Sequence, residues 1–167
     1  MGQYNRRDKI LEVFYENPKR EFTIRELEKR TNIPRSTTHI ILRDLKKQGL
    51  IDSENKAAST ILFKLKKTNF FVEKIAYSGL IDFLIKKLNP SAIVLFGGVR
   101  KGESDKESDI DLFVETPVKY NLDLKRFERR LKHKIDLFLY DNIKDVHNDL
   151  RANIINGIKL YGYLDIK

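Results

Sequence analysis

Apolar residues at the start of the chain recur at helical spacing and are separated by short polar turns. In residues 6–16 they fall on one side of a helix, which Asn17-Pro18 ends. Thr23 and Glu26 form a capping-box pattern, in which each side chain satisfies the other's exposed backbone donor, so a second helix is predicted at about residues 24–31. The apolar positions of the first helix are Ile10, Leu11, Val13 and Phe14.

A third helix with a clear inner stripe follows the turn at Asn32-Ile33-Pro34. Pro34 suits the first turn of a helix and Gly49 suits its C-terminal end, so the pattern predicts a helix that runs to about Gln48. Farther on, residues 60–67 alternate between apolar and polar positions, which is typical of a half-buried strand. The inner positions are Thr38, Ile41, Leu42 and Leu45 in the helix, and Ile61, Phe63 and Leu65 in the strand.

Three helices followed by a hairpin are the plan of a winged helix-turn-helix domain, predicted here for residues 1–68. The segment IPRSTTHIILRDLKKQGLI closely resembles the recognition helix and wing entry of small prokaryotic transcriptional regulators with this fold. The resemblance covers nearly all of residues 5–68 and implies DNA binding in transcription regulation. Regulators of this kind are often dimers, so a homodimer is one expectation.

Polar and basic side chains off the inner stripe are the candidate DNA contacts. A helix fits the major groove with its N-terminal side chains near base edges, while flanking cations hold phosphates. The alternative is a protein-interaction or dimerisation module with a solvated basic face. The candidate base readers are Arg35, Ser36, Thr37, His39 and Arg43; the candidate phosphate contacts are Lys46 and Lys47, with Lys64 and Lys66 near the expected wing.

The net charge of +9 is concentrated in the same part of the chain. Residues 1–68 carry 16 Lys and Arg against 9 Asp and Glu, whereas residues 69–167 carry 17 against 15. This asymmetry favours a polyanionic partner for the first domain, with an attraction that weakens in salt.

The second half of the chain begins with a helical pattern and continues with three apolar strands. Residues 69–88 have helical spacing, Gly79 is a place for that helix to bend or break, and Asn89-Pro90 ends it. The expected fold class is therefore α+β in two domains, residues 1–68 and 69–167, the second with a small mixed sheet flanked by helices. The strands are predicted at residues 91–96, 109–115 and 135–140.

Acidic residues alternate with apolar ones in the second and third of these strands. Because successive side chains point to opposite faces, Asp109 and Asp111 share a face and lie about 7 Å apart along the backbone. Asp136 occupies the same kind of position in the third strand and joins them if the two strands are neighbours. Three carboxylates can hold one or two Mg²⁺ ions, which bridge triphosphate oxygens and activate an attacking hydroxyl. All three are candidate catalytic residues and metal ligands, with Asp136 as the candidate general base.

Two glycines and two cations precede this acidic pair. Gly97-Gly98 lets the backbone approach a phosphate closely, with amide donors aimed at the anion. Arg100 and Lys101 supply positive charge for the rest of a triphosphate. These four residues are the candidate nucleotide-binding set.

The segment LFGGVRKGESDKESDIDLFVE resembles the DNA polymerase β-like nucleotidyltransferase superfamily, whose signature is Gly, then Gly or Ser, a gap and Asp-x-Asp. Here the gap, Val99–Ser108, is ten residues long. The chain looks most like the minimal nucleotidyltransferases, often paired with HEPN-domain partners in toxin–antitoxin modules, and IINGIKLYG resembles their C-terminal segment. The resemblance spans about residues 72–163. It implies Mg²⁺-dependent transfer of a nucleoside monophosphate from an NTP such as ATP to an acceptor hydroxyl, with a HEPN-type partner protein as one acceptor.

One departure from that pattern favours a second interpretation. The minimal enzymes usually have Gly-Ser where this chain has Gly97-Gly98, so a hydroxyl that would contact phosphate or metal is absent. The alternative is a transcriptional regulator whose second domain binds nucleotide or a partner without catalysis. In a third interpretation both halves are protein-interaction modules. The basic segment Lys125–Lys134 is predicted to be a helix, either with a solvated face or in contact with nucleic acid or an acidic partner.

Several other classes of protein are disfavoured. The chain has no cysteine, which excludes disulfides and thiolate metal sites, and its three histidines lack the close spacing of a zinc site. No apolar run reaches the roughly 18 residues of a membrane span, and MGQYNRRDKI lacks the apolar core of a signal peptide. A soluble, cytoplasmic protein is therefore expected. The histidines are His39, His133 and His147.

Overall fold

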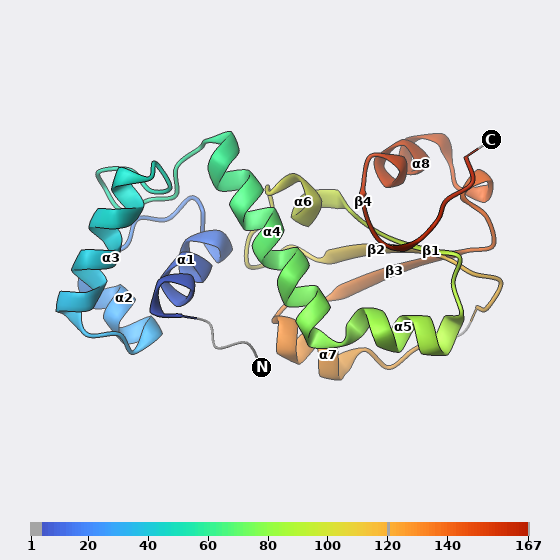
Figure 1. Ribbon diagram of the computed structural model, residues 1–167, viewed down its shortest axis with the longest axis horizontal. Helices are drawn as coiled ribbons and strands as arrows, with labels where there is room; N and C mark the ends of the chain where they lie inside the picture. Colours follow the sequence, from blue (N-terminus) through green and yellow to red (C-terminus); the bar gives the residue numbers. More distant parts are fainter. Residues whose placement is uncertain (1–4, 120, 167) are drawn as a thin grey trace. The chain divides into compact units, whose positions relative to one another are not determined.

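The computed structural model describes residues 5–119 and 121–166, so residues 1–4, 120 and 167 of the two expected domains lie outside the described residues. The chain divides into two compact units, Met1–Lys67 and Thr68–Lys167 (Figure 1). The mixture of helices with a four-stranded mixed sheet confirms the predicted α+β class. None of the helices in the described part of the chain is long and apolar enough to cross a membrane.

The first unit contains α1 (Arg6–Glu16), α2 (Ile24–Thr31), α3 (Arg35–Lys47) and the first residues of α4 (Ile61–Ser78). The predicted capping box is present at the start of α2. The Glu26 amide donates to Thr23 Oγ1 at 3.2 Å, and the Thr23 amide donates to Glu26 Oε2 at 2.9 Å. The hydrogen bond from the Thr23 backbone also lowers the pKa of the Glu26 carboxyl.

The core of the first unit is built from the inner stripes of its helices. Phe14 meets Phe22 edge-on, with 5.5 Å between ring centroids, and Tyr15 packs on Phe63 at 5.2 Å. Burial raises the pKa of the Tyr15 hydroxyl to about 12, so this phenol is neutral at physiological pH. The fully buried apolar side chains include Ile10, Phe14, Leu27, Leu45 and Leu50.

The strand predicted for residues 60–67 is wrong, because these residues begin α4. Thr60 Oγ1 accepts from the Phe63 amide at 3.2 Å, as a helix-capping side chain does. The buried positions of α4 recur at helical spacings of three and four residues, whereas Ile61 and Leu65, expected on the buried side of a strand, are 77% and 58% exposed. The wing is therefore reduced to a single bridge between Ile51 and Ala57. The buried residues of α4 are Phe63, Lys67, Thr68, Phe71, Lys74, Ile75 and Ser78.

The second unit is organised around a sheet with strand order β3-β2-β1-β4. Strand β1 pairs antiparallel with β2 and β4, while β2 and β3 are parallel. The predicted break at Gly79 is confirmed, because this residue has φ of 78° and separates α4 from α5 (Leu80–Leu88). The last helix and strand of the unit were not assigned from periodicity. The strands are β1 (Ala92–Phe96), β2 (Ile110–Glu115), β3 (Ile135–Tyr140) and β4 (Ile158–Gly162).

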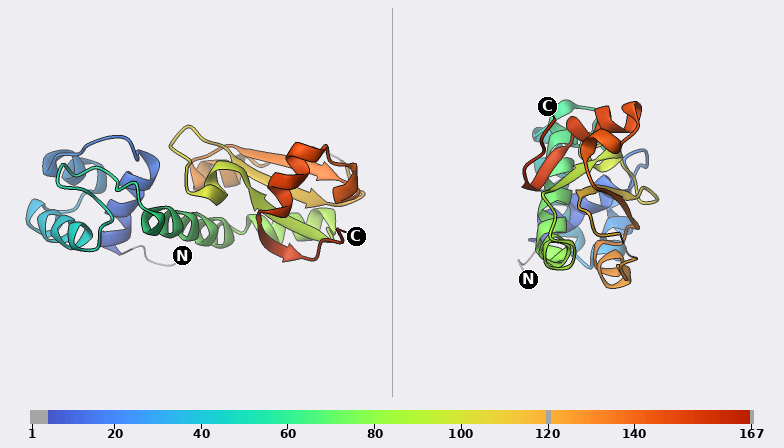
Figure 2. Two further views of the ribbon diagram at one scale, coloured as in Figure 1. Left: turned by 90° about the horizontal axis from the view of Figure 1, so that it is seen from above. Right: turned by 90° about the vertical axis from the view of Figure 1, so that its right-hand side faces the viewer.

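Helices cover both faces of this sheet. Figure 1 and the right-hand view of Figure 2 show α8 (Asn148–Ile155) on one side of it, with α5 and α7 (Lys125–Leu131) on the other. On the side of α5 and α7, Phe83 packs on Phe127 at 5.1 Å between ring centroids. On the side of α8, the core includes the 3-10 helix η1 (Ile143–Asp145). The buried residues of that core are Val94, Phe96, Phe113, Ile143, Val146 and Ile154.

Candidate active site and DNA interface

The pairing of β2 with β3 brings two of the predicted acids together. Asp111 and Asp136 are partners in the parallel register, so their side chains leave the same face of the sheet. Asp111 is also the partner of Phe96, the last residue of β1. Asp109 lies just before β2 (Ile110–Glu115), two residues from Asp111. The acids therefore gather on the face of the sheet that carries Phe96, where β1 ends.

The electrostatic environment of Asp111 includes the other two carboxylates. The pKa of Asp111 is raised, first by partial burial and then by the negative charges of Asp136 and Asp109. Within the described residues, however, no three His, Asp or Glu side chains are arranged closely enough to enclose a metal ion. The carboxylates thus lie near one another without forming a closed cage. Their mutual repulsion is what a divalent cation would relieve.

Gly97 fits closely against the Asp111 carboxylate. This glycine begins α6 (Gly97–Lys101) with φ of 69°, a conformation that disfavours every residue with a Cβ. A Cβ built on it would also collide with Asp111 Oδ2. Gly98 is different, since a Cβ there would meet nothing closer than Ser104 at 3.8 Å. Only the first of the two glycines is therefore required by packing.

The segment after the glycines is partly helical, because α6 continues to Lys101. Arg100 is half-buried and Lys101 is exposed. Thr68 Oγ1 donates to the carbonyl oxygens of Val99 and Arg100, at 3.3 and 3.1 Å, which ties this turn to the second part of α4. Arg100 and Lys101 therefore come shortly after Gly97, the residue that packs against Asp111.

A hollow of about 420 Å³, lined by both basic and acidic side chains, lies beside Asp109. Its wall includes the end of α7, which stops at Leu131 because Lys132 has φ of 63°, so the predicted helix to Lys134 is too long. The sequence predicts either a solvated face or a contact with nucleic acid or an acidic partner for this segment, and nothing in its periodicity indicates a place beside Asp109. The residues that line the hollow include Lys106, Asp109, Arg129, Lys132, His133 and Lys134.

His133, for which the sequence predicts no role, lies between the starts of β2 and β3. Its side chain is 4% exposed, and Nδ1 is 2.6 Å from the carbonyl oxygen of Ser108. A carbonyl only accepts hydrogen bonds, so Nδ1 carries the proton. The ring also meets Phe71 edge-on at 5.3 Å. His133 therefore holds the residue that precedes Asp109.

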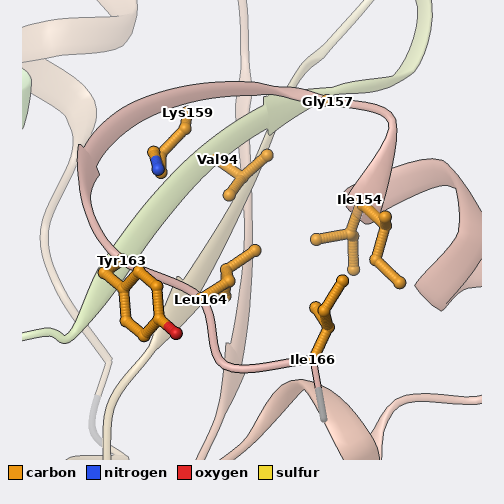
Figure 3. Close-up of a pocket in the computed structure, with 8 residues that line it drawn as sticks. Val94, Ile154, Gly157, Lys159, Tyr163, Leu164 and Ile166 are labelled. Atoms are coloured by element: carbon orange, nitrogen blue, oxygen red, sulfur yellow. The ribbon is translucent and has the colours of Figure 1, made fainter.

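A separate, mainly apolar pocket of about 220 Å³ lies where β1 meets β4, away from the edge formed by β2 and β3 (Figure 3). The chain after β4 curves around it, and Figure 3 shows Lys159 and Tyr163 at its side and Ile166 at its end. None of the candidate catalytic or nucleotide-binding residues lines this pocket. It is therefore distinct from the acidic site.

In the first unit, α3 presents most of the predicted DNA contacts to solvent. Ser36, His39 and Arg43 are exposed, and Thr37 is half-buried. Arg35 is exposed as well, with its Nε 2.6 Å from Glu28 Oε2 on α2. The helix thus has a polar outer face opposite the inner stripe.

The predicted phosphate contacts occupy two separate places. Lys46 and Lys47 are exposed in the last turn of α3, where the Lys46 ammonium donates to the carbonyl oxygen of Ser53 at 2.8 Å. Lys64 and Lys66 lie on α4, so their expected position near a wing strand is wrong. Ile40, which was not among the candidates, is exposed in the middle of α3.

Comparisons with known proteins agree with both halves of this description. A family model described as the nucleotidyltransferase domain matches residues 77–161, and a model of the MarR family matches residues 9–58. No curated protein and no solved structure matches the chain. The chain therefore belongs to the nucleotidyltransferase domain family and carries a MarR-family winged-helix domain ahead of that domain.

Proposed function

We propose that the C-terminal unit transfers a nucleoside monophosphate from an NTP such as ATP to an acceptor hydroxyl, with Mg²⁺. The observation that carries this proposal is the parallel pairing of Asp111 with Asp136 beside Gly97. Carboxylate oxygens are the ligands that Mg²⁺ prefers. The pKa of Asp111 is raised first by partial burial and then by the neighbouring carboxylates, whose repulsion a divalent cation would offset. Asp109, Asp111 and Asp136 would hold one or two ions after side-chain rotation.

The residues of this chain then have separate roles. Bound Mg²⁺ would neutralise charge on the triphosphate and lower the pKa of the acceptor hydroxyl. Asp136 accepts the proton of that hydroxyl as its oxygen bonds to the α-phosphorus and pyrophosphate leaves. The backbone at Gly97 and Gly98 approaches the phosphates, while Arg100 and Lys101 balance their charge.

Label transfer tests this proposal. The full chain is incubated with Mg²⁺, each of the four NTPs labelled at the α-phosphate, and candidate acceptors that include the chain itself. We expect transfer that is lost in Asp109→Asn plus Asp111→Asn. Asp141→Asn is the matched control, because Asp141 lies beyond the far end of β3 and pairs with Lys119 at 3.0 Å. Transfer that survives the double substitution contradicts the assignment of the acids.

The second candidate function is a regulator that binds nucleotide, or a partner, without catalysis. Gly98 favours it, since a serine hydroxyl is absent at this position. It predicts Mg-NTP binding by calorimetry with no label transfer to any acceptor. The space around Gly98 admits a side chain, so Gly98→Ser can be made without a clash. Label transfer that appears in this variant would show that the missing hydroxyl is the reason why the wild type lacks catalysis.

For the N-terminal unit, the proposal is sequence-specific binding to DNA at an operator, with base contacts from α3. The concentration of positive charge in residues 1–68 and the MarR-family match support it. Fluorescence anisotropy with random-sequence and genomic DNA should show binding that weakens steeply with salt. A chain that binds neither DNA nor Mg-NTP would instead favour the interpretation of both halves as protein-interaction modules.

A homodimer and a HEPN-type partner complete the proposal. Ile61, Leu62 and Leu65 are exposed on the first turns of α4, at 77%, 47% and 58%, and such apolar groups favour contact with another protein. Light scattering should show a dimer for the full wild-type chain and a monomer for the double variant Leu62→Glu plus Leu65→Glu. Label transfer to a co-purified HEPN-domain protein tests the toxin–antitoxin role that the family resemblance implies.

A further inference from the structure

Ile40 is an apolar side chain on the outer face of α3, where every other exposed residue is polar or charged. It is 57% exposed in the middle of the helix. The remaining apolar residues of α3 belong to its inner stripe, so Ile40 contributes little to the core of its unit. This aliphatic group is therefore available for a contact with another molecule.

The neighbours of Ile40 are suited to a nucleic acid. Helical geometry places Ser36 and Thr37 one turn before it and Arg43 and Asp44 one turn after it. Hydroxyls and a guanidinium are groups that bind base edges and phosphates. The outer face of α3 thus presents an apolar tip between hydrogen-bonding groups.

The one acidic residue of α3 is held by other side chains. Asp44 Oδ2 is 3.4 Å from Arg7 Nε and accepts from Gln48 Nε2 at 2.8 Å. The Arg7 guanidinium also donates to Gln48 Oε1 at 2.6 Å. These contacts give Asp44 a cationic partner, which reduces its repulsion of a phosphate backbone. The surface around Ile40 is accordingly compatible with a polyanion.

A polyanion that also offers an apolar surface to a helix is double-stranded DNA. The C5-methyl group of thymine is the apolar group that unmodified DNA presents in the major groove, and 5-methylcytosine presents the same group. We propose that Ile40 contacts a pyrimidine C5-methyl group and makes it part of the recognised sequence. This inference rests on the proposed DNA binding by α3. It makes Ile40 a specificity-determining residue, because hydrogen-bonding side chains alone do not recognise a methyl group.

Replacing thymine with uracil tests the proposal, because it removes one methyl group and no hydrogen-bonding atom. A tight site is first selected from random DNA with the full chain, and each thymine in it is then replaced singly. For the wild type we expect weaker binding at one or two positions, by about 3- to 5-fold, the value of one buried methyl group. At a sensitive position, cytosine should bind more weakly than 5-methylcytosine.

Variants of Ile40 separate this contact from other causes. Ile40→Ala should bind thymine and uracil sites equally, whereas Ile40→Val should keep part of the preference. Ile155→Ala is the matched control, since it truncates an isoleucine that is 45% exposed in the second unit, and the preference should persist in it. Thermal unfolding of each variant checks that the fold is retained.

Three results would overturn the inference. If uracil replacement does not change the DNA affinity, or changes it equally in Ile40→Ala and the wild type, then Ile40 does not contact the methyl group. The DNA-binding proposal itself stays intact in that case. No binding to any DNA defeats the DNA-binding proposal itself, and the inference with it. If Ile40→Ala leaves DNA affinity and its uracil response unchanged but alters the oligomeric mass, Ile40 serves a protein contact instead.

Discussion

The two units differ in how their candidate sites are assembled. The proposed DNA-binding face of the first unit comes from α3, a single helix whose outer residues follow one another in the sequence. The acidic site of the second unit comes from two strands and a glycine turn, and Asp136 is 25 residues from Asp111 in the chain. A contiguous site depends on local helix geometry, whereas a dispersed site depends on strand register. Changes at the two sites should therefore have separable effects.

Charge divides the units in the same way. Cations dominate the N-terminal unit, where a polyanion would bind from outside. In the C-terminal unit, like charges are brought together, and partial burial followed by these charges raises the pKa of Asp111. Such a cluster is unfavourable without a cation, so its presence points to chemistry rather than to stability.

The largest expected effect is on catalysis. Asp136→Asn removes the proposed proton acceptor and should lower the rate of label transfer by about 10²- to 10⁴-fold, with DNA affinity unchanged. Rates and DNA affinities measured on the same preparations test this independence. An equal fall in DNA affinity would show that the two units act as one.

The next effect concerns DNA. Arg43→Ala removes an exposed guanidinium from α3 and should weaken binding to the preferred site by about 1–3 kcal/mol, or about 5- to 150-fold. Label transfer should not change. Anisotropy titrations on specific and random DNA distinguish the loss of a base contact, which reduces specificity, from the loss of a phosphate contact, which weakens both equally.

The two glycines should differ in their effect on stability. Gly97→Ala forces a Cβ against Asp111 Oδ2 at φ of 69°, and should lower the free energy of unfolding by about 1–3 kcal/mol. Gly98→Ser is the matched control and should change it by no more than about 0.5 kcal/mol. Urea unfolding measures both. Equal losses of unfolding free energy in Gly97→Ala and Gly98→Ser would show that Asp111 does not lie against Gly97.

The smallest effect is a gain in stability that depends on pH. The folded state raises the pKa of Asp111, so it binds this proton more tightly than the unfolded chain. Stability is therefore lost as pH rises from the carboxyl's ordinary value through its raised folded value. Asp111→Asn should raise the melting temperature at pH 7 and bring little gain well below the ordinary carboxyl pKa. Addition of Mg²⁺ should stabilise the wild type more than the variant.

Residues 60–67 show why local patterns fail. Ile61, Phe63 and Leu65 alternate as in a strand, but α4 continues for further turns in which Phe71 and Ile75 extend the helical spacing from Phe63. A short apolar run satisfies both periods, and the packing of the longer element decides between them. The same limitation left α8 and β4 unassigned, because both are short and only partly buried.

The order of residues alone determined the capped start of α2, the inner and outer faces of α3, and the alternation that places acids on one side of β2 and β3. These features depend on backbone geometry over a few residues, and the side chains of each short segment are enough to set that geometry. Only the tertiary structure decided that β2 and β3 are parallel neighbours with Asp111 beside Asp136, and that the Asp111 carboxylate lies against Gly97. Strand order and close packing arise from burial of the whole core, so no single segment contains them.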